Sequence, residues 1–216
     1  MKSLILSLFI LISFTGQTQS ITEGKVIYTI TYLESDIDPQ MLSMMPTEAV
    51  MYFTNDKTRM EMKMGMGMNL VTLTDNKLKN TTVLMDVMGN KTAMTMTEDD
   101  IKKEAKKAGE YEIVKTNETK NIAGYQCKKA IVTLKDKNQF NVWYTDQIKV
   151  SNVNWNNQFK NIDGFLMEFK MDQNSGMSMN MTAKSITAEK TPEQLFIIPE
   201  GYKKMTKDEM MKQYQH

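Results

Sequence analysis

Apolar and polar residues alternate along most of the chain after its apolar start. The alternation is clearest in four stretches, at 26–32, 140–144, 165–171 and 177–183. Strict alternation is typical of half-buried strands, which have one covered face and one face in water. Short polar turns separate the stretches. The pattern therefore predicts an antiparallel meander of short strands.

One helix is well marked between the strands, at residues 97–109. Thr97 and Asp100 form a capping box at its start, and Gly109 can end it. Its apolar stripe is narrow, so we expect it to pack lightly, on or near the concave face of the sheet.

Two further segments break the alternation. Thr206 and Glu209 form a second capping box, which predicts a short C-terminal helix. Residues 36–49 contain Pro39 and Pro46 and an apolar cluster at 41–45. We interpret them as a short helix or loop, inserted between the first two strands, that covers the open end of the sheet.

Methionine is the most unusual feature of the composition, with 22 residues against 8 Phe, 8 Tyr and 2 Trp. In MEMKMGMGM, at 60–68, every second residue is Met. One continuous strand would place these residues on a single face, whereas a hairpin turning near 65–67 would place them opposite one another. The candidate binding residues of this kind are Met60, Met62, Met64, Met66, Met68, Met94, Met96, Met177, Met179 and Met181.

Three interpretations of these methionines remain open. They could fill an ordinary core, since Met packs into irregular gaps. They could line a cavity for a hydrophobic ligand or peptide, because flexible Met surfaces adapt to their partners. They could also bind Cu(I) or Ag(I), which soft thioethers select. The candidate Cu(I) ligands are Met62, Met64, Met66, Met177 and Met179.

Catalytic and nucleic-acid-binding chemistry find little support. The formal net charge is +1, which removes the usual electrostatic reason for a nucleic-acid partner. His216 is the single histidine and the last residue, so a Ser-His-Asp or Cys-His site and a His/Cys zinc site are excluded. Cys127 is interpreted as a small buried residue on a strand. We predict a protein without enzymatic activity or cofactor.

The start of the chain resembles an export signal. A basic Met1-Lys2 precedes an apolar run at 4–12, which is too short to span a bilayer comfortably. We predict a signal peptide at 1–18, a single domain at 19–204 and a helical tail at 205–216. The mature chain would have no transmembrane segment. No cysteine stands at the cleavage site to carry a lipid, so we expect a soluble periplasmic or secreted protein.

Several stretches resemble the GLPGLI-type exported proteins of Bacteroidota and their relatives that carry a domain of unknown function. They are IAGYQCKKA at 122–130, VWYT at 142–145, NIDGFLMEF at 161–169, EGKV at 23–26 and FIIPEGY at 196–202. In the third, Asp163 stands in place of the family's Pro and Phe165 in place of its Leu, so the match is to the relatives. The resemblance implies an exported, mostly β protein without a known activity.

The order of strands and helices also resembles the half-barrels of lipoprotein carriers of the LolA/LolB type, a likeness of fold that does not fix function. We therefore predict a mainly β fold of the α+β class. Its expected form is an antiparallel half-barrel meander, with a helix on or near the concave face and a short C-terminal helix. The leading functional hypothesis is an apolar, lipid-like ligand held on a Met-rich concave face. The alternatives are Cu(I)/Ag(I) binding, and a structural or partner-binding envelope protein with a filled core.

Overall fold

The computed structural model describes residues 20–33, 37–108, 111–134, 137–172, 178–207 and 209. The predicted signal peptide and most of the predicted C-terminal tail lie outside these residues. The described residues form one mixed sheet of 12 strands with two α-helices, so the predicted mainly β fold is confirmed.

The elements follow one another along the chain with short connections. The first half contains β1 (Gly24–Tyr32), α1 (Pro39–Met44), β2 (Glu48–Phe53), β3 (Lys57–Lys63), β4 (Met68–Asp75), β5 (Asn80–Val87), β6 (Asn90–Thr97) and α2 (Glu98–Ala108). The second half contains β7 (Glu112–Ile122), β8 (Tyr125–Thr133), β9 (Gln139–Thr145), β10 (Phe165–Asp172), β11 (Ser178–Thr187), a 3-10 helix η1 (Glu193–Phe196) and β12 (Lys203–Met205).

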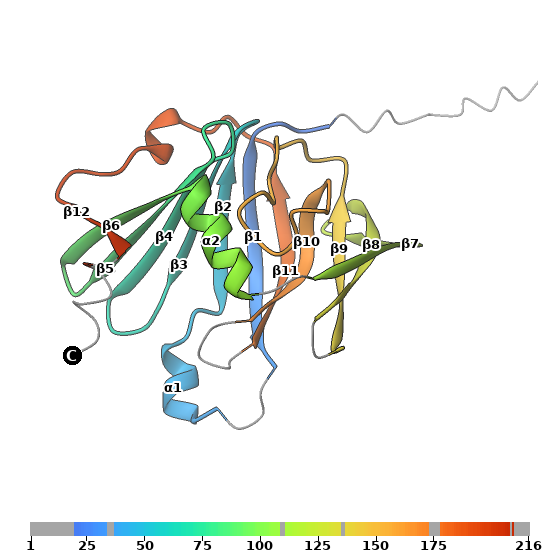
Figure 1. Cartoon of the computed structure of the whole chain (residues 1–216), viewed down its shortest axis with the longest axis horizontal. Helices are drawn as coiled ribbons and strands as arrows, with labels where there is room; N and C mark the ends of the chain where they lie inside the picture. Colours follow the sequence, from blue (N-terminus) through green and yellow to red (C-terminus); the bar gives the residue numbers. More distant parts are fainter. Residues whose placement is uncertain are drawn as a thin grey trace, which may run out of the picture.

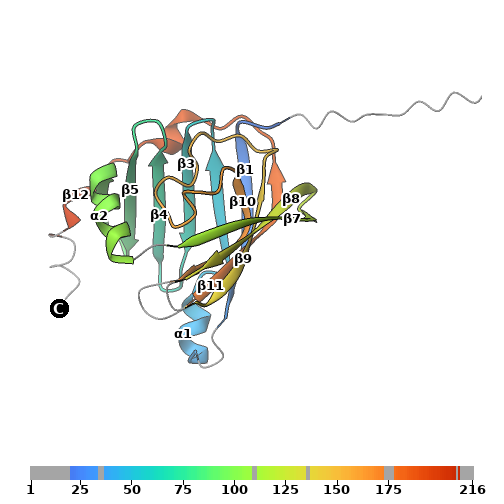
Figure 2. The same ribbon diagram turned by 45° about the vertical axis from the view of Figure 1, so that its right-hand side comes forward.

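The sheet consists of two antiparallel meanders joined along β1 and β11. The strand order is β12-β6-β5-β4-β3-β2-β1-β11-β10-β9-β8-β7. β12 pairs with β6 in parallel, which makes the sheet mixed where the alternation predicted antiparallel pairing alone. Figures 1 and 2 show a strongly curved sheet, as expected for a half-barrel. α2 connects β6 to β7 along the chain and is drawn in front of the inner face in Figure 1.

The main core lies on the inner face at β1 and β8–β11 and extends to Ala49 and Phe53 of β2 and Met62 of β3. Tyr28, Met167 and Met181 are buried there, and the Tyr28 hydroxyl donates a hydrogen bond to the Leu166 carbonyl at 2.9 Å. The connection between β9 and β10, residues 146–164, also folds into this core. Phe159 of this connection meets Phe169 edge to face, with ring centroids 5.8 Å apart. The sequence patterns did not predict this inward-folded connection.

A second, smaller core lies on the outer face of the sheet. Ile198 and Tyr202 pack over a patch of β4, β5 and β6 formed by Val71, Leu73, Leu84 and Ala93. These two residues belong to the segment 188–205, which we call the C-terminal strap. Arg59 Nη1 donates a hydrogen bond to the Leu195 carbonyl at 2.8 Å and so fixes the strap to β3.

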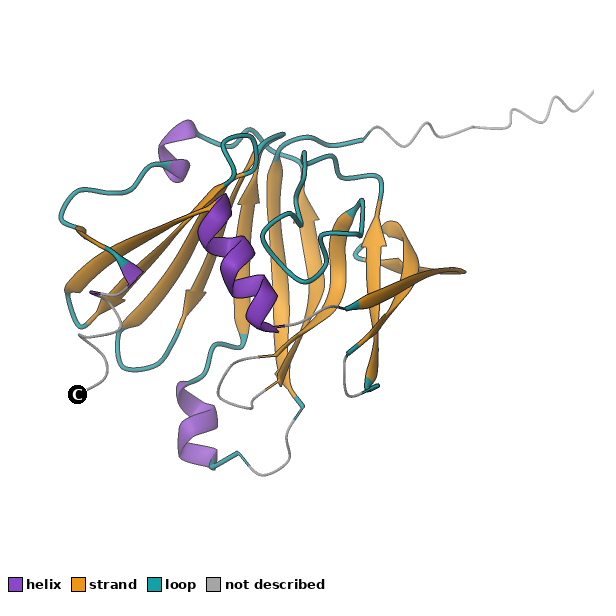
Figure 3. Cartoon of the chain, in the orientation of Figure 1, coloured by secondary structure: helices purple, strands orange, loops and turns teal. Residues whose placement is uncertain are grey.

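Both predicted internal helical segments are confirmed, although one of them packs differently from our expectation. α2 begins with the expected capping box, in which Thr97 N donates to Asp100 Oδ2 at 3.0 Å and Asp100 N to Thr97 Oγ1 at 3.3 Å. α1 was expected to cover the open end of the sheet, yet none of its residues is buried. Figure 3 shows α1 extending away from the body of the sheet.

The second capping box is also present. Thr206 N donates to Glu209 Oε2 at 2.8 Å, and Glu209 N donates to Thr206 Oγ1 at 3.3 Å. The rest of the predicted C-terminal helix falls outside the described residues. Among the helices that the structure describes, none is long and apolar enough to cross a membrane.

Candidate functional site

The inner face of strands β2–β6 carries rows of apolar side chains from neighbouring strands. Cross-strand partners share a face of a sheet, so the register identifies each row. One row runs Met51, Met60, Thr72, Val83 and Met94, and the next runs Ala49, Met62, Leu70, Met85 and Thr92. Met96 begins the row on the other side, opposite Thr81.

Many of these side chains remain partly exposed, unlike the core residues of β1 and β8–β11. We call the partly exposed apolar set the Met face; it consists of Met51, Met60, Leu70, Val83, Met85, Met94 and Met96. On β4–β6 the outer-face residues Leu73, Leu84 and Ala93 are buried beneath the strap. On these strands the outer apolar residues are buried, whereas the apolar residues of the Met face are only partly buried. Met51, Met60 and Leu70 pack against the main core, and Val83, Met85, Met94 and Met96 continue the face onto β5 and β6.

The 146–164 connection closes the Met face at its upper end, as drawn in Figure 1. Asn156 Nδ2 donates to Thr81 Oγ1 at 2.9 Å and lies 3.4 Å from Thr74 Oγ1. Trp155 Nε1 donates to Asn76 Oδ1 at 3.0 Å. These bonds join the second meander to the β4–β5 hairpin across the inner face, so the upper end is filled by polar contacts.

α2 passes in front of the inner face without sealing it. No side chain described in α2 is buried, and Ile101 is partly exposed. Two ion pairs at the surface join the described part of α2 to other elements: Glu98 pairs with Lys79 at 3.0 Å, and Glu104 pairs with Lys207 at 2.7 Å. Exposed pairs of this kind contribute about 0–1 kcal/mol each.

The predicted candidate residues fall into three groups. Met60, Met94 and Met96 belong to the Met face, and Met62 lies in the same rows but is buried at 9% exposure. Met179 and Met181 face the same side on β11 but belong to the filled core. Met64 and Met66 lie in the β3–β4 turn and Met68 begins β4, which confirms the hairpin interpretation of 60–68. Met177 lies outside the described residues.

The candidate Cu(I) ligands are not brought together. Met62 on β3 and Met179 on β11 are separated by β2 and β1, so three strand spacings of about 4.8 Å lie between them. Met66 is 73% exposed at the tip of its turn. Within the described residues, no group of three or more His, Cys, Asp or Glu side chains is placed to hold a metal ion.

Sequence reasoning missed two residues of the Met face, Met51 and Met85. Both follow period-2 alternation, in EAVMYF and NTTVLMDV. Their signal was weak because the intervening residues, such as Val50 and Leu84, are also apolar. Either face of these strands could have been the buried one, and the strap decides the choice.

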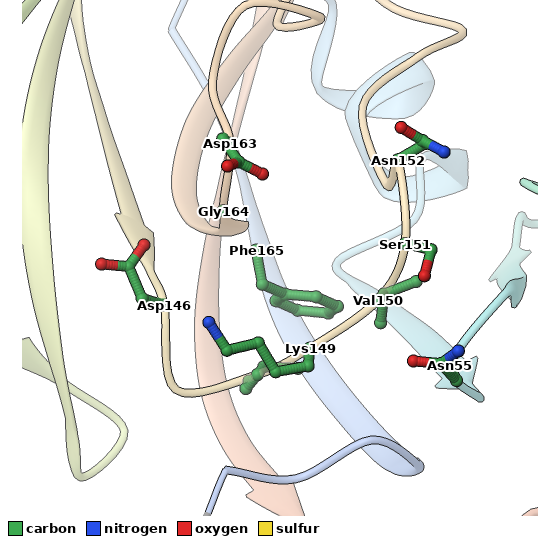
Figure 4. A pocket seen from close by; sticks show the side chains of 10 residues that line it. Asn55, Asp146, Lys149, Val150, Ser151, Asn152, Asp163, Gly164 and Phe165 are labelled. Carbon is green, nitrogen blue, oxygen red and sulfur yellow. The ribbon is translucent and has the colours of Figure 1, made fainter.

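Two hollows on the surface lie at the edges of this arrangement. One, of about 450 Å³, lies beside the first part of the 146–164 connection, where Asp146, Lys149 and Asp163 are its charged lining residues (Figure 4). The other, of about 570 Å³, lies between α2 and β12 and reaches the Met face at Met96. Asp146 is already paired with Lys128, and the first hollow has a mainly polar lining unsuited to an apolar ligand.

Cys127 matches its interpretation as a buried strand residue. Burial raises the pKa of its thiol to about 11, and Sγ donates a hydrogen bond to the Tyr125 carbonyl oxygen at 3.3 Å. The thiol is therefore protonated near neutral pH, whereas a nucleophilic cysteine needs a lowered pKa.

Comparison with known proteins identifies the family and the fold. "Structure of PNGF-II in C2 space group" aligns with a TM-score of 0.55 and 18% identity, covering 89% of this chain and 32% of the other, so this chain spans about a third of that protein. "Crystal structure of MucB" aligns with a TM-score of 0.33 and 11% identity, covering 85% of this chain and 58% of the other. No curated protein matches. A family model described as "Domain of unknown function (DUF4412)" matches residues 40–202, which include the Met face and most of the sheet, and the chain belongs to this family.

Proposed function

We propose that the protein binds an apolar ligand with a flexible chain, such as a fatty acyl chain, on the Met face. The observation that carries the proposal is the partial exposure of Met51, Met60, Met85, Met94 and Met96 on one face of neighbouring strands. A protein that needed only a core would bury this face as it buries Met167 and Met181.

The chemistry of methionine suits such a ligand. Its side chain is unbranched and polarizable, so a row of methionines adapts to chains of different length and saturation. Fully burying one such side chain contributes about 1.5–3 kcal/mol, and partly exposed ones contribute a fraction of that. Five of them, less the cost of immobilising the ligand, support an affinity on the order of micromolar.

The same proposal includes export and the absence of catalysis. The basic and apolar start of the sequence supports a signal peptide and a periplasmic or secreted location. The resemblance to GLPGLI-type proteins, which are exported, supports an envelope location. Burial raises the pKa of the Cys127 thiol, which argues against a cysteine nucleophile and fits the proposed absence of catalysis.

Ligand uptake can be measured with a fluorescent fatty acid added to the purified full-length mature protein. Met85→Gln with Met94→Gln keeps side-chain length but makes the face polar, and we expect a loss of affinity of tenfold or more. The matched control is Met88→Gln, at a turn position that is 81% exposed and outside the face. Equal binding by all three proteins would refute the proposal.

Native mass spectrometry of protein from its own cell envelope complements this test. The proposal expects a bound apolar species that is depleted in the Met85→Gln/Met94→Gln variant. Competition for Cu(I) against a chromogenic chelator provides the contrast, because an apolar carrier should not compete. Strong Cu(I) uptake that the same variant removes would favour the metal-binding alternative.

A further inference from the structure

The lower end of the sheet, as drawn in Figure 1, carries a group of exposed apolar residues. Eight large apolar side chains are exposed in the described residues, and five of them lie at this end. These five are Leu33, Met41, Leu42, Met66 and Met88, and we call them the apolar rim. They come from the end of β1, from α1 and from the β3–β4 and β5–β6 turns.

α1 is built in a way that keeps its apolar residues in water. Its sequence is PQMLSM, and none of its residues is buried. It is held to the β3–β4 turn by a hydrogen bond from Gly65 N to the Met44 carbonyl at 2.7 Å. A Cβ on Gly65 would lie 2.9 Å from Met44 Cα, so the two segments meet backbone to backbone. Figures 1 and 2 show α1 below the sheet, and its Met41 and Leu42 are exposed.

The two tip methionines occupy backbone conformations that disfavour them. Met66 and Gly67 have φ values of 58° and 70°, and Met88 and Gly89 have values of 52° and 89°. Positive φ at both central residues defines a type I′ turn, for which Asn-Gly is strongly preferred. A left-handed conformation is costly for a side chain such as Met. The chain therefore accepts strain at two neighbouring turns that both place a methionine in solvent, 73% and 81% exposed.

Two lysines point into solvent beside the rim, and two carboxylates there bond to the backbone of their own turns. Lys63 and Lys91 are exposed at the ends of β3 and β6, next to the two turns. The carboxylates nearby are engaged in their own turns: Asp38 accepts from Gln40 N at 2.7 Å, and Asp86 accepts from Gly89 N at 2.9 Å. Protruding apolar side chains flanked by lysines are the features of a protein that lies on a lipid bilayer.

We propose that the apolar rim docks the protein on a phospholipid bilayer, with the tip methionines and α1 inserted at the interface. Side chains that project from separate turns and a short helix fit the soft boundary of a bilayer better than a flat protein surface. The rim also continues into the lower rows of the Met face at Met68 and Val87, which pair across β4 and β5. The inference goes beyond the proposed ligand binding, since docking does not require an occupied Met face.

The turn geometry supplies a sharp test with the full-length mature protein. Met66→Asn with Met88→Asn puts the preferred residue into both turns, so we expect a Tm raised by about 2–4 °C. The same variant should bind vesicles of phosphatidylethanolamine and phosphatidylglycerol on the order of a hundredfold more weakly in flotation assays, about tenfold for each methionine. A gain in stability with a loss of vesicle binding is not expected if these methionines have a purely structural role.

Ala123→Asn is the matched control. Ala123 and Gly124 have φ values of 51° and 89° and form the turn between β7 and β8. Thr145 Oγ1 donates a hydrogen bond to the carbonyl of Gln126, close to this turn. Strands β7 and β8 lie on the far side of the sheet from α1 in Figure 1. Because Ala123 also packs partly against the main core, we expect little net change in Tm, and vesicle binding should be unchanged. A second pair of variants tests the same point. Leu42→Gln changes the rim, and its control is Leu78→Gln in the β4–β5 turn at the opposite end of the sheet, where Leu78 is also exposed. Leu42→Gln alone should weaken flotation.

Three results would overturn the inference. The unmodified protein would fail to float with vesicles, or the rim and control variants would float equally. Alternatively, the unmodified protein would self-associate without vesicles and the rim variants would not, which would make the rim a contact between protein copies. Uptake of a fluorescent fatty acid from water is a separate readout, so failure of rim docking and failure of Met-face binding can be distinguished.

Discussion

At the scale of the residue, the same amino acid has three different environments in this protein. Met181 is fully buried on β11, Met94 is partly exposed on β6, and Met88 is 81% exposed at a turn. All three occur in period-2 or turn patterns that look alike in the sequence. The environment of each depends on what covers the strand, which alternation alone does not encode.

Replacing methionines with alanine separates the core from the Met face. Met181→Ala removes a buried side chain and leaves a cavity, so we expect a loss of about 2–5 kcal/mol in the free energy of unfolding. Met94→Ala should cost clearly less than Met181→Ala, because part of its side chain remains in contact with water when the protein is folded. Urea denaturation measures both values. Similar losses for the two variants would mean that β6 is part of a filled core.

At the scale of the element, the sequence predicted the strands and helices better than their partners. Alternation located the strands around 26–32 and 165–171, and the Thr97–Asp100 capping box located the start of α2. The inner and outer faces of β4 and β5 could not be assigned, because Leu70 and Leu73, or Val83 and Leu84, supply apolar residues to both faces. The inward path of 146–164 also escaped prediction, since its contacts with β4 and β5 join residues more than 70 positions apart.

The C-terminal strap should hold the β4–β6 part of the sheet in place. Ile198→Asp puts a charge against Val71, Leu73 and Leu84, which disfavours docking of the strap. We expect faster amide hydrogen exchange in β4–β6 and little change in β8–β10, whose core lies on the other face.

The matched control for the strap is Ile197→Asp, whose side chain is 61% exposed in the neighbouring position. It should leave exchange close to that of the unmodified protein. Uniformly faster exchange across both meanders in the Ile198→Asp variant would contradict a local role for the strap.

At the scale of the whole molecule, the two halves of the curved sheet differ in which of their faces is covered. The half formed by β1 and β7–β11 contains the main core, and its 146–164 connection closes the upper end of the inner face. The half formed by β2–β6 has its outer face covered by the strap and its inner face partly open. The sequence identified Met60, Met94 and Met96 as candidates but could not separate them from Met179 and Met181, which the second meander buries.

Methionine methyl NMR tests the central claim most directly, because it reports on each environment in one spectrum. The mature protein would be labelled at its methionine methyl groups and titrated with dodecanoate below its micellar concentration. We predict shifts for Met51, Met60, Met85, Met94 and Met96, and unchanged signals for the core residues Met167, Met179 and Met181. Unchanged signals throughout the Met face, or shifts confined to the exposed Met66 and Met88, would contradict the account.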